Sequence, residues 1–281
     1  MGAIKEKMKR DMEIRGLSKR TQETYLGCAR LFVKYFMKSP DALTLEDVHD
    51  FQLHLIRERK IAESTFNVYS KALKFLYGVT LKQDWNIEQI PYHRRGKKLP
   101  MVLTREEVVK LYKAIPNIKH KAMILTLYST GMRASELAHL KISDIDSERM
   151  LIRIDQGKNR KDRYVRLSAK LLSILRLYWL AQNPKPKTWL FPGYSEVQPI
   201  NRNTVRITVT KAKEAAGIQK PVTTHMLRHS FATHMLEDGV DIRKIQLMLG
   251  HRSLRTTAKY LHVASNYLRE AKNPLDTLDL K

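Results

Sequence analysis

Residues 224–260 read THMLRHSFATHMLEDGVDIRKIQLMLGHRSLRTTAKY, and this stretch decides how the rest of the chain is interpreted. Four of its side chains stand out as two imidazoles, a guanidinium and a phenol within a short span: His225, His251, Arg228 and Tyr260. These four side chains could be an accident of a basic helical segment. They could also be three groups that handle a phosphate and one nucleophile, and the rest of the sequence bears on that choice.

The charge of the chain indicates a polyanionic partner. The 281 residues include 52 Lys and Arg against 28 Asp and Glu, which gives a formal net charge of +24. Each phosphate that a basic side chain neutralises releases condensed counterions, so an excess of this size favours nucleic acid. The basic residues are spread along the chain, which favours a protein that wraps its partner over one with a basic arm. A merely solvated basic surface is the alternative.

Composition also limits the other classes of protein. No apolar run reaches the ~18 residues that a membrane-spanning helix needs, and the charged start MGAIKEKMKRDMEIRG lacks the apolar region of a secretory signal. The one cysteine, Cys28, cannot form an internal disulfide. No Gly-rich phosphate loop and no carboxylate cluster at metal-ligand spacing appears. We therefore expect a cytoplasmic protein without a membrane-spanning helix, and the sequence indicates no cofactor or metal site.

Residues 1–92 are predicted to form a small all-helical domain. Ser18 caps a helix over 18–37 whose apolar positions recur every three or four residues. Thr44 opens a capping box before a second helix, and Ser64 is expected to cap a third. A basic run with a glycine and a proline follows at 93–103, which is typical of an inter-domain linker.

Residues 104–272 are predicted to form a second domain of mixed structure, so the fold class is mainly α with an α+β second domain. Short β-rich runs at 142–146, 150–154 and 164–167 predict a small antiparallel sheet with a charged hairpin between the last two. The expected helices cover 104–115, 118–130, a short segment from 133, and then 168–182, 201–216, 224–238, 241–249 and 253–270. A tail at 273–281 begins with a proline break and keeps three leucines.

The polar residues of the second domain suit attack on a phosphodiester. His225 and Arg228 are three apart and share one helix face. Arg133 follows a glycine turn, and Lys158 lies at the expected hairpin tip. A phenol can be the nucleophile, two arginines can clamp the phosphate oxygens, and a lysine or histidine can move the proton. Each residue by itself is more often structural, and His229 and His234 are expected to be packing or supporting residues.

Taken in order, these segments resemble the tyrosine recombinase (phage integrase) family, including its Xer-like members. The matching segments are TGMRASEL at 130–137, HMLRHSFAT at 225–233, LGH at 249–251 and TTAKYLHV at 256–263. The resemblance is specific over about 100–265, and it is weaker for the N-terminal helices, which are similar to the DNA core-binding (SAM-like) domain of the family. Met132 stands where Leu is commoner, and Asn159 stands where a glycine is frequent.

The resemblance implies a role for each residue of the site. Tyr260 would be the nucleophile that forms a 3′-phosphotyrosyl link. Arg133 and Arg228 would bind the scissile phosphate, with His251 as a further donor. His225 would help with proton transfer at the tyrosine. Lys158 would protonate the 5′ leaving oxygen, and Glu136 would support the site from behind. Lys161 is the fallback for the lysine, because the hairpin register is uncertain.

The resemblance also implies a partner and an assembly. The expected substrate is double-stranded DNA with paired recombinase sites, clamped between the two domains. Four protomers would act on two duplexes, and the free protein would be a monomer or weak dimer. The tail could dock on a neighbouring protomer or fold back in cis. The alternatives are a type IB topoisomerase-like DNA relaxing enzyme and a non-catalytic DNA-binding protein. The target site, and the choice among integration, excision, transposition and dimer resolution, stay open.

Overall fold

The structure, a computed structural model, describes residues 2–93, 100–155, 162–195, 197–261 and 263. The chain divides into two compact units, Met1–Lys97 and Lys98–Lys281. The hairpin lysines and the C-terminal tail discussed above lie outside the described residues.

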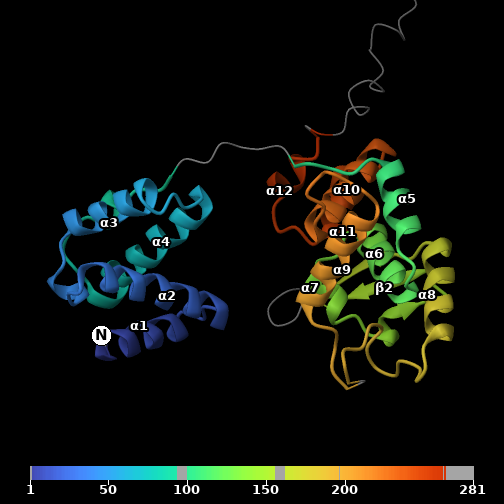
Figure 1. Cartoon of the computed structure of the whole chain (residues 1–281), viewed down its shortest axis with the longest axis horizontal. Coiled ribbons are helices and arrows are strands. Elements are labelled where there is room, and N and C mark those ends of the chain that lie inside the picture. The colour runs from blue at the N-terminus through green and yellow to red at the C-terminus, as the bar shows by residue number, and fades with distance from the viewer. Residues whose placement is uncertain (1, 94–99, 156–161, 196, 262, 264–281) are drawn as a thin grey trace, which may run out of the picture. The chain divides into compact units, whose positions relative to one another are not determined.

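The N-terminal unit is built from helices (Figure 1). The four α-helices are α1 (Gly2–Ile14), α2 (Lys19–Phe36), α3 (Leu45–Arg57) and α4 (Glu63–Phe75), and α4 runs on into a π-helical segment at Leu76–Leu81. Two 3-10 turns, Pro40–Ala42 and Ile87–Gln89, complete this unit. The N-terminal unit is helical as the fold class predicted, and its described residues form one α-helix more than the three expected from the sequence.

The caps of these helices were partly predicted. Ser18 accepts a hydrogen bond from the Thr21 N–H at the start of α2, and Thr44 forms a full capping box with Asp47. The prediction that Ser64 caps the third helix was wrong. Helix α4 begins at Glu63, one residue before Ser64, and Ala62 stands at the cap position.

Helix α1 was missed because seven of its thirteen residues are charged and its apolar face is narrow. Its buried residues are Met8 and Met12, which are four apart and so lie on one face. Ile4, Met8 and Met12 recur every four residues, but this narrow stripe gives a weak periodic signal, although it is enough to anchor the helix on the core.

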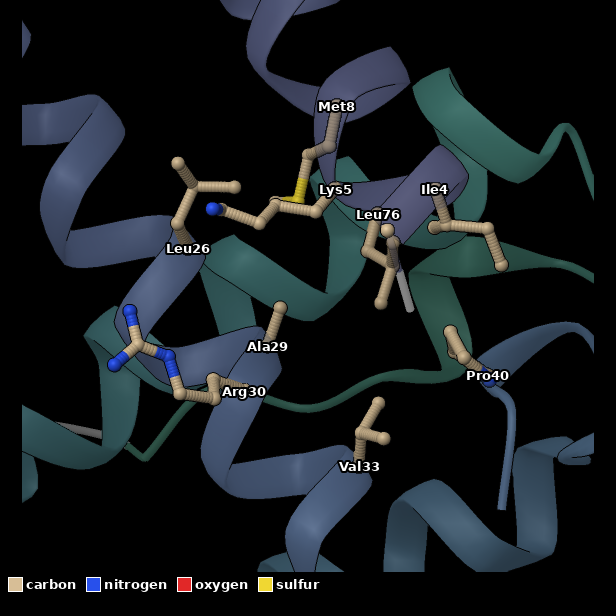
Figure 2. A pocket seen from close by; sticks show the side chains of 10 residues that line it. Ile4, Lys5, Met8, Leu26, Ala29, Arg30, Val33, Pro40 and Leu76 are labelled. Atoms are coloured by element: carbon tan, nitrogen blue, oxygen red, sulfur yellow. The ribbon is translucent and has the colours of Figure 1, made fainter.

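Aromatic rings fill the core of the N-terminal unit. Phe32 lies edge-on to Phe51 and Tyr77, with ring centroids 5.1 and 6.1 Å apart, and the buried Tyr77 hydroxyl donates to the Pro40 carbonyl. Beside this core is an apolar cavity of about 210 Å³. Figure 2 shows its walls, which include Met8 and Val33. The cavity contains none of the residues of the predicted site, so the chemistry must be sought in the other unit.

The second unit contains the sheet and the remaining helices. The three strands β1 (Ile145–Asp146), β2 (Leu151–Ile154) and β3 (Arg163–Arg166) are antiparallel in that order, with Ile152 opposite Val165 on the buried face. The α-helices before and after it are α5 (Arg105–Ala114), α6 (Ile118–Thr130), α7 (Ala134–Ala138), α8 (Ala169–Ala181), α9 (Arg202–Ala215), α10 (Thr224–Glu237), α11 (Ile242–Leu249) and α12 (Leu254–Ala258). The predicted fold class is confirmed.

Helix α10 is the central element of this unit. It packs against α6, α9 and α11 (Figure 1). Ten of its fourteen residues are buried, including Arg228 and His234. A helix enclosed on most sides shows little amphipathic pattern. Its polar side chains must therefore find partners inside the protein.

The last described helix is shorter than expected. The sequence predicted a helix over 253–270, but α12 ends at Ala258 and residues 259–261 form a turn. The Tyr260 N–H donates to the Thr257 carbonyl, three residues back, so the chain turns more tightly than in an α-helix. Tyr260 is buried at this turn. Residues 264–270 of the expected helix lie outside the described residues.

Among the described residues, no helix combines the length and the apolar composition that crossing a bilayer requires.

Candidate active site

Arg228 is buried in α10 and is held by the ends of two other helices. Its Nη1 donates to the Gly131 carbonyl at 2.7 Å, and its Nη2 donates to the Leu249 carbonyl at 2.6 Å. Gly131 caps the C-terminus of α6, and Leu249 is the last residue of α11. Carbonyls at helix C-termini carry partial negative charge, so they stabilise a guanidinium. They do so without the full charge of a carboxylate.

The charge of Arg228 therefore stays available to an anion. Burial lowers its pKa to about 10, with the positive charge of Arg133 acting in the same direction. That pKa still leaves the guanidinium fully protonated at neutral pH. Arg228 is thus a buried cation whose described hydrogen bonds go to backbone carbonyls only.

Arg133 stands at the start of α7 and is fixed by Glu136. The Glu136 carboxylate accepts from the Arg133 backbone N–H at 2.7 Å and from its Nη1, also at 2.7 Å. The Arg133 side chain remains 28% exposed. Helix α7 directly follows the α6 end that holds Arg228, so the two arginines come from adjoining parts of the fold.

Arg163, at the start of β3, is the second partner of Glu136 and was not singled out from the sequence. Its Nη1 and Nη2 donate to the two Glu136 oxygens at 3.1 and 2.8 Å, and its Nε donates to the Met248 carbonyl. Burial would raise the pKa of Glu136, but hydrogen bonds and charge from Arg163, and then from Arg133, lower it to about 2. Successive side chains of a strand point to opposite faces, so Arg163 shares the buried face with Val165. This alternation is the sequence signal that could have identified Arg163 as a buried charge.

His251 lies just beyond the end of α11. Gly250 adopts a left-handed conformation with φ 64°, and the chain then turns so that His251 Nδ1 lies 2.9 Å from the Thr257 hydroxyl. Burial lowers the pKa of His251 to about 3, helped by the charges of Arg228 and Lys259. The imidazole is therefore neutral at physiological pH, with one nitrogen occupied by Thr257.

Tyr260 is buried within the same part of the unit. Its side chain is 1% exposed and packs in a cluster with Phe231, Ile245 and Leu249. Burial raises its pKa to about 12, while the charges of Arg228 and then Arg133 oppose that rise. The phenol is therefore neutral and lies within the electrostatic reach of both arginines.

His225 and His229, in the first two turns of α10, occupy different positions. The Tyr260 hydroxyl lies 2.9 Å from His229 Nδ1. His225 is one turn earlier, exposed at the surface, with its ring centroid 6.4 Å from that of His229. The part of its ring that is turned into the protein is desolvated, and this desolvation, followed by the charge of Arg228, lowers the pKa of His225. His229, expected to be a packing or supporting residue, thus makes the direct contact with the phenol.

The structure thus groups Arg133, Glu136, Arg228, His251 and Tyr260 around the ends of α6, α10, α11 and α12. Lys158 and Lys161 lie outside the described residues. Within the described part of the chain, no group of three or more His, Cys, Asp and Glu side chains is placed to hold a metal ion. The described groups can bind an anion next to the buried, protonated phenol of Tyr260.

A helical N-terminal unit, followed by a helical unit with a small sheet and an arginine, histidine and tyrosine site, defines the class of tyrosine recombinases. Comparison with protein-family models agrees: residues 101–266 match the phage integrase family, and residues 4–87 match the phage integrase N-terminal SAM-like domain. The chain belongs to the phage integrase family, and it is an enzyme of the tyrosine recombinase type.

Relatives cover nearly the whole chain. It is 44% identical over 279 residues to a protein of Sinorhizobium fredii that carries the name integrase/recombinase y4qK. The match covers 99% of this chain and 90% of that protein. It is 36% identical to tyrosine recombinase XerA of Thermococcus onnurineus, covering 93% and 91% of the two chains. Among solved structures, XerH site-specific recombinase bound to a palindromic difH substrate, in a post-cleavage complex, matches with 25% identity and a TM-score of 0.74, covering 95% and 83%.

Proposed function

We propose that this protein is a site-specific recombinase that cleaves and rejoins DNA through a 3′-phosphotyrosyl intermediate formed by Tyr260. The observation that carries the proposal is the buried phenol of Tyr260 beside Arg228, a guanidinium held by carbonyls. A phosphate that entered this site would meet a cation whose hydrogen bonds, among the described residues, go to backbone carbonyls, and a hydroxyl that could attack it. Transesterification conserves the bond energy, so the reaction needs no nucleotide.

Arg133 and Arg228 are proposed to bind the non-bridging oxygens of the scissile phosphate. Glu136 is proposed to brace Arg133 from behind, and its second partner Arg163 would fix it in turn. Donors of this kind are worth most where charge develops in the transition state, and removal of one typically costs about 2.7–4 kcal/mol of barrier.

His251 is proposed to donate a further hydrogen bond to the phosphate. Because its pKa is about 3, it acts as a neutral donor. If the Thr257 hydroxyl donates to Nδ1, the proton of the imidazole sits on Nε2, where it can be given to an anion. Thr257 would therefore select the useful tautomer.

The remaining proton steps are assigned to His225 and to a hairpin lysine. His225 is proposed to assist proton transfer at the tyrosine, and Lys158 to protonate the 5′ leaving oxygen, with Lys161 as the alternative lysine. Lys158→Ala should slow cleavage of ordinary DNA, and much less that of DNA with a better 5′ leaving group. The same pattern in Lys161→Ala would assign the role to the other lysine.

The proposed substrate is double-stranded DNA with paired recombinase sites. Support comes from the formal charge of +24 and from XerH, a relative whose structure contains its difH substrate. Residues 1–92 are proposed as the core-binding domain, 93–103 as a basic linker and 104–272 as the catalytic domain. We propose that the protein works in the cytoplasm, on the nucleoid, as four protomers on two duplexes.

An apolar groove in the second unit supports contact between protomers. It encloses about 1030 Å³ and is lined by side chains of α5, α6, α8, α10 and α11, with Leu125, Ile174 and Met248 among its apolar residues. Lys113, Arg166 and Lys170 also line it. The tail at 273–281 carries three leucines and two aspartates, the composition that such a groove would bind. We assign the tail of a neighbouring protomer to this groove.

Truncation after Asn273 tests the tail, and Lys170→Glu tests the groove. Both variants should reduce complexes of several protomers on paired sites and leave binding of one protomer to a half-site unchanged. The measurement is the distribution of complexes on native gels at a series of protein concentrations. Unchanged recombination by the truncated protein would contradict the assignment.

The central experiment uses nicked suicide substrates that trap a covalent intermediate. The wild-type protein should form an adduct on its cognate site, and Tyr260→Phe should bind the same DNA without forming one. The absence of an adduct from the wild-type protein would favour a non-catalytic DNA-binding protein. An adduct accompanied by relaxation of supercoiled DNA without site preference would favour the topoisomerase-like alternative.

A further inference from the structure

His229 is the residue in direct contact with the proposed nucleophile. It follows Arg228 on α10, and its Nδ1 lies 2.9 Å from the Tyr260 hydroxyl, with the two rings tilted by 54°. Within the described part of the chain, this is the one hydrogen bond of the phenol that the structure gives. A buried hydroxyl without a partner would be costly, so the contact fixes where the phenolic oxygen sits.

The imidazole of His229 is neutral at neutral pH, so one ring nitrogen can accept a proton. Burial lowers its pKa to about 4, and the charges of Lys259, His225 and Arg228 act in the same direction. At neutral pH the ring is therefore uncharged and keeps one lone pair. The phenol, with a pKa raised to about 12, retains its hydrogen. The natural assignment is that the Tyr260 O–H donates to Nδ1 and that the ring hydrogen is on Nε2.

We propose that His229 is a catalytic residue, the base that receives the Tyr260 proton as the phenolic oxygen attacks the phosphate; this rests on the function proposed above. In that step the O–H bond of Tyr260 breaks and its proton moves to His229 Nδ1. A bond forms between the phenolic oxygen and phosphorus, while the bond from phosphorus to the 5′ oxygen breaks and that oxygen takes a proton from the general acid proposed above. In religation the 5′-hydroxyl attacks and gives its proton back to that acid, while His229 returns its own proton to the departing phenolate.

This assignment separates His225 from His229 on α10 by depth. His229 is at the phenol, whereas His225 is exposed one turn nearer the helix N-terminus, with the rings 6.4 Å apart. His225 would then act on the phosphate side or pass the proton onward, and it would not touch the nucleophile first. The sequence pattern could not separate them, because positions 225 and 229 lie on the same helix face.

The test measures single-turnover formation of the covalent adduct on a suicide substrate. His229→Ala removes the base, and adduct formation should slow by about 10²-fold or more. His229→Asn keeps an acceptor atom near the place of Nδ1 but has no basic nitrogen, so it should stay nearly as slow as the alanine variant. DNA affinity and thermal unfolding of both variants, measured alongside, should match the wild-type protein within a few-fold and a few degrees.

A second measurement separates proton transfer from structural support. A fluorinated tyrosine incorporated at position 260 has a more acidic phenol, which depends less on a base. The defect of His229→Ala should shrink markedly when the fluorinated residue replaces Tyr260, and a defect of unchanged size would overturn the proposal. Wild-type rates in His229→Asn would also overturn it, because a hydrogen-bond acceptor would then suffice.

These outcomes are distinct from failure of the proposed function. If the wild-type protein forms no adduct, the recombinase proposal itself fails. If the wild-type protein forms an adduct and His229→Ala forms it equally fast, only the role of His229 is rejected.

Discussion

Glu136 holds two arginines at once, and its charge is essential to both contacts. Its carboxylate accepts from Arg133 and Arg163, and its side chain is 9% exposed. Removal of one partner from a buried ion pair typically costs about 3–5 kcal/mol, because the other charge is left uncompensated. Glu136→Gln should therefore lower both stability and cleavage rate, whereas Glu148→Gln, an exposed acidic residue in the same unit, should change neither.

The same carboxylate predicts how stability depends on pH. The pKa of Glu136 is about 2 in the folded protein, below its ordinary value of 4.5. A depressed pKa contributes stability that is fully present above the unfolded value and is lost as pH falls through the folded value. The loss should amount to about 3 kcal/mol between pH 5 and pH 2.

Urea unfolding of the full chain at several pH values measures this loss. Tryptophan fluorescence follows it, since Trp179 and Trp189 lie in the second unit. Glu136→Gln should flatten the acid limb of the stability curve, and a limb as steep as that of the wild-type protein would contradict the assignment.

At this scale, residue types and spacing predicted part of the site. Arg133, Arg228, His251 and Tyr260 were selected because their segments are distinctive, and they lie in one part of the second unit, while their roles stay a prediction. Arg163 and His229 were not selected, since their importance comes from partners 27 and 31 residues away. Such contacts are set by tertiary packing, and no local pattern encodes them.

At the scale of elements, the turn between α6 and α7 positions both arginines. Gly131 has φ +61°, and its carbonyl accepts from Arg228. A Cβ added there would lie 2.5 Å from Phe231 Cδ1 and 2.9 Å from Leu249 Cδ2. Gly217 is a matched control, because it has φ +64° and nothing within 4 Å of an added Cβ.

Alanine at each glycine separates backbone strain from crowding. Gly217→Ala should cost about 1–2 kcal/mol of stability through its left-handed backbone alone. Gly131→Ala should cost about 1–3 kcal/mol more through overpacking, and it should slow cleavage by displacing Arg228. Thermal unfolding and single-turnover cleavage provide the two readouts. Equal stability losses in the two variants would show that crowding at Gly131 is unimportant.

The elements themselves were predicted where local signals are strong. The helix at 118–130 has the predicted bounds, and the predicted capping box at Thr44 is present. Helix α1 was missed for lack of a strong apolar face, and α12 was predicted too long because its periodicity continues past the turn at Tyr260. Both errors occur where tertiary contacts override local preference.

At the scale of the whole molecule, the excess of positive charge predicts strongly salt-dependent binding. With a formal charge of +24, the protein should contact several phosphates on a duplex. The logarithm of the binding constant should fall linearly with the logarithm of salt concentration, with a slope of about −0.9 for each phosphate contacted. Tyr260→Phe is the appropriate protein for this titration, because covalent capture would otherwise distort the equilibrium. A flat response would contradict extensive contact with the DNA backbone.

The central claim is that Tyr260 attacks the phosphate, and mapping the covalent bond tests it most directly. The trapped adduct would be digested with protease and nuclease, and the nucleotide-bearing peptide sequenced by mass spectrometry. The account predicts that the nucleotide is joined to Tyr260 through its 3′ phosphate and that the released strand carries a 5′-hydroxyl. Attachment to any other residue, or through a 5′ phosphate, would contradict it.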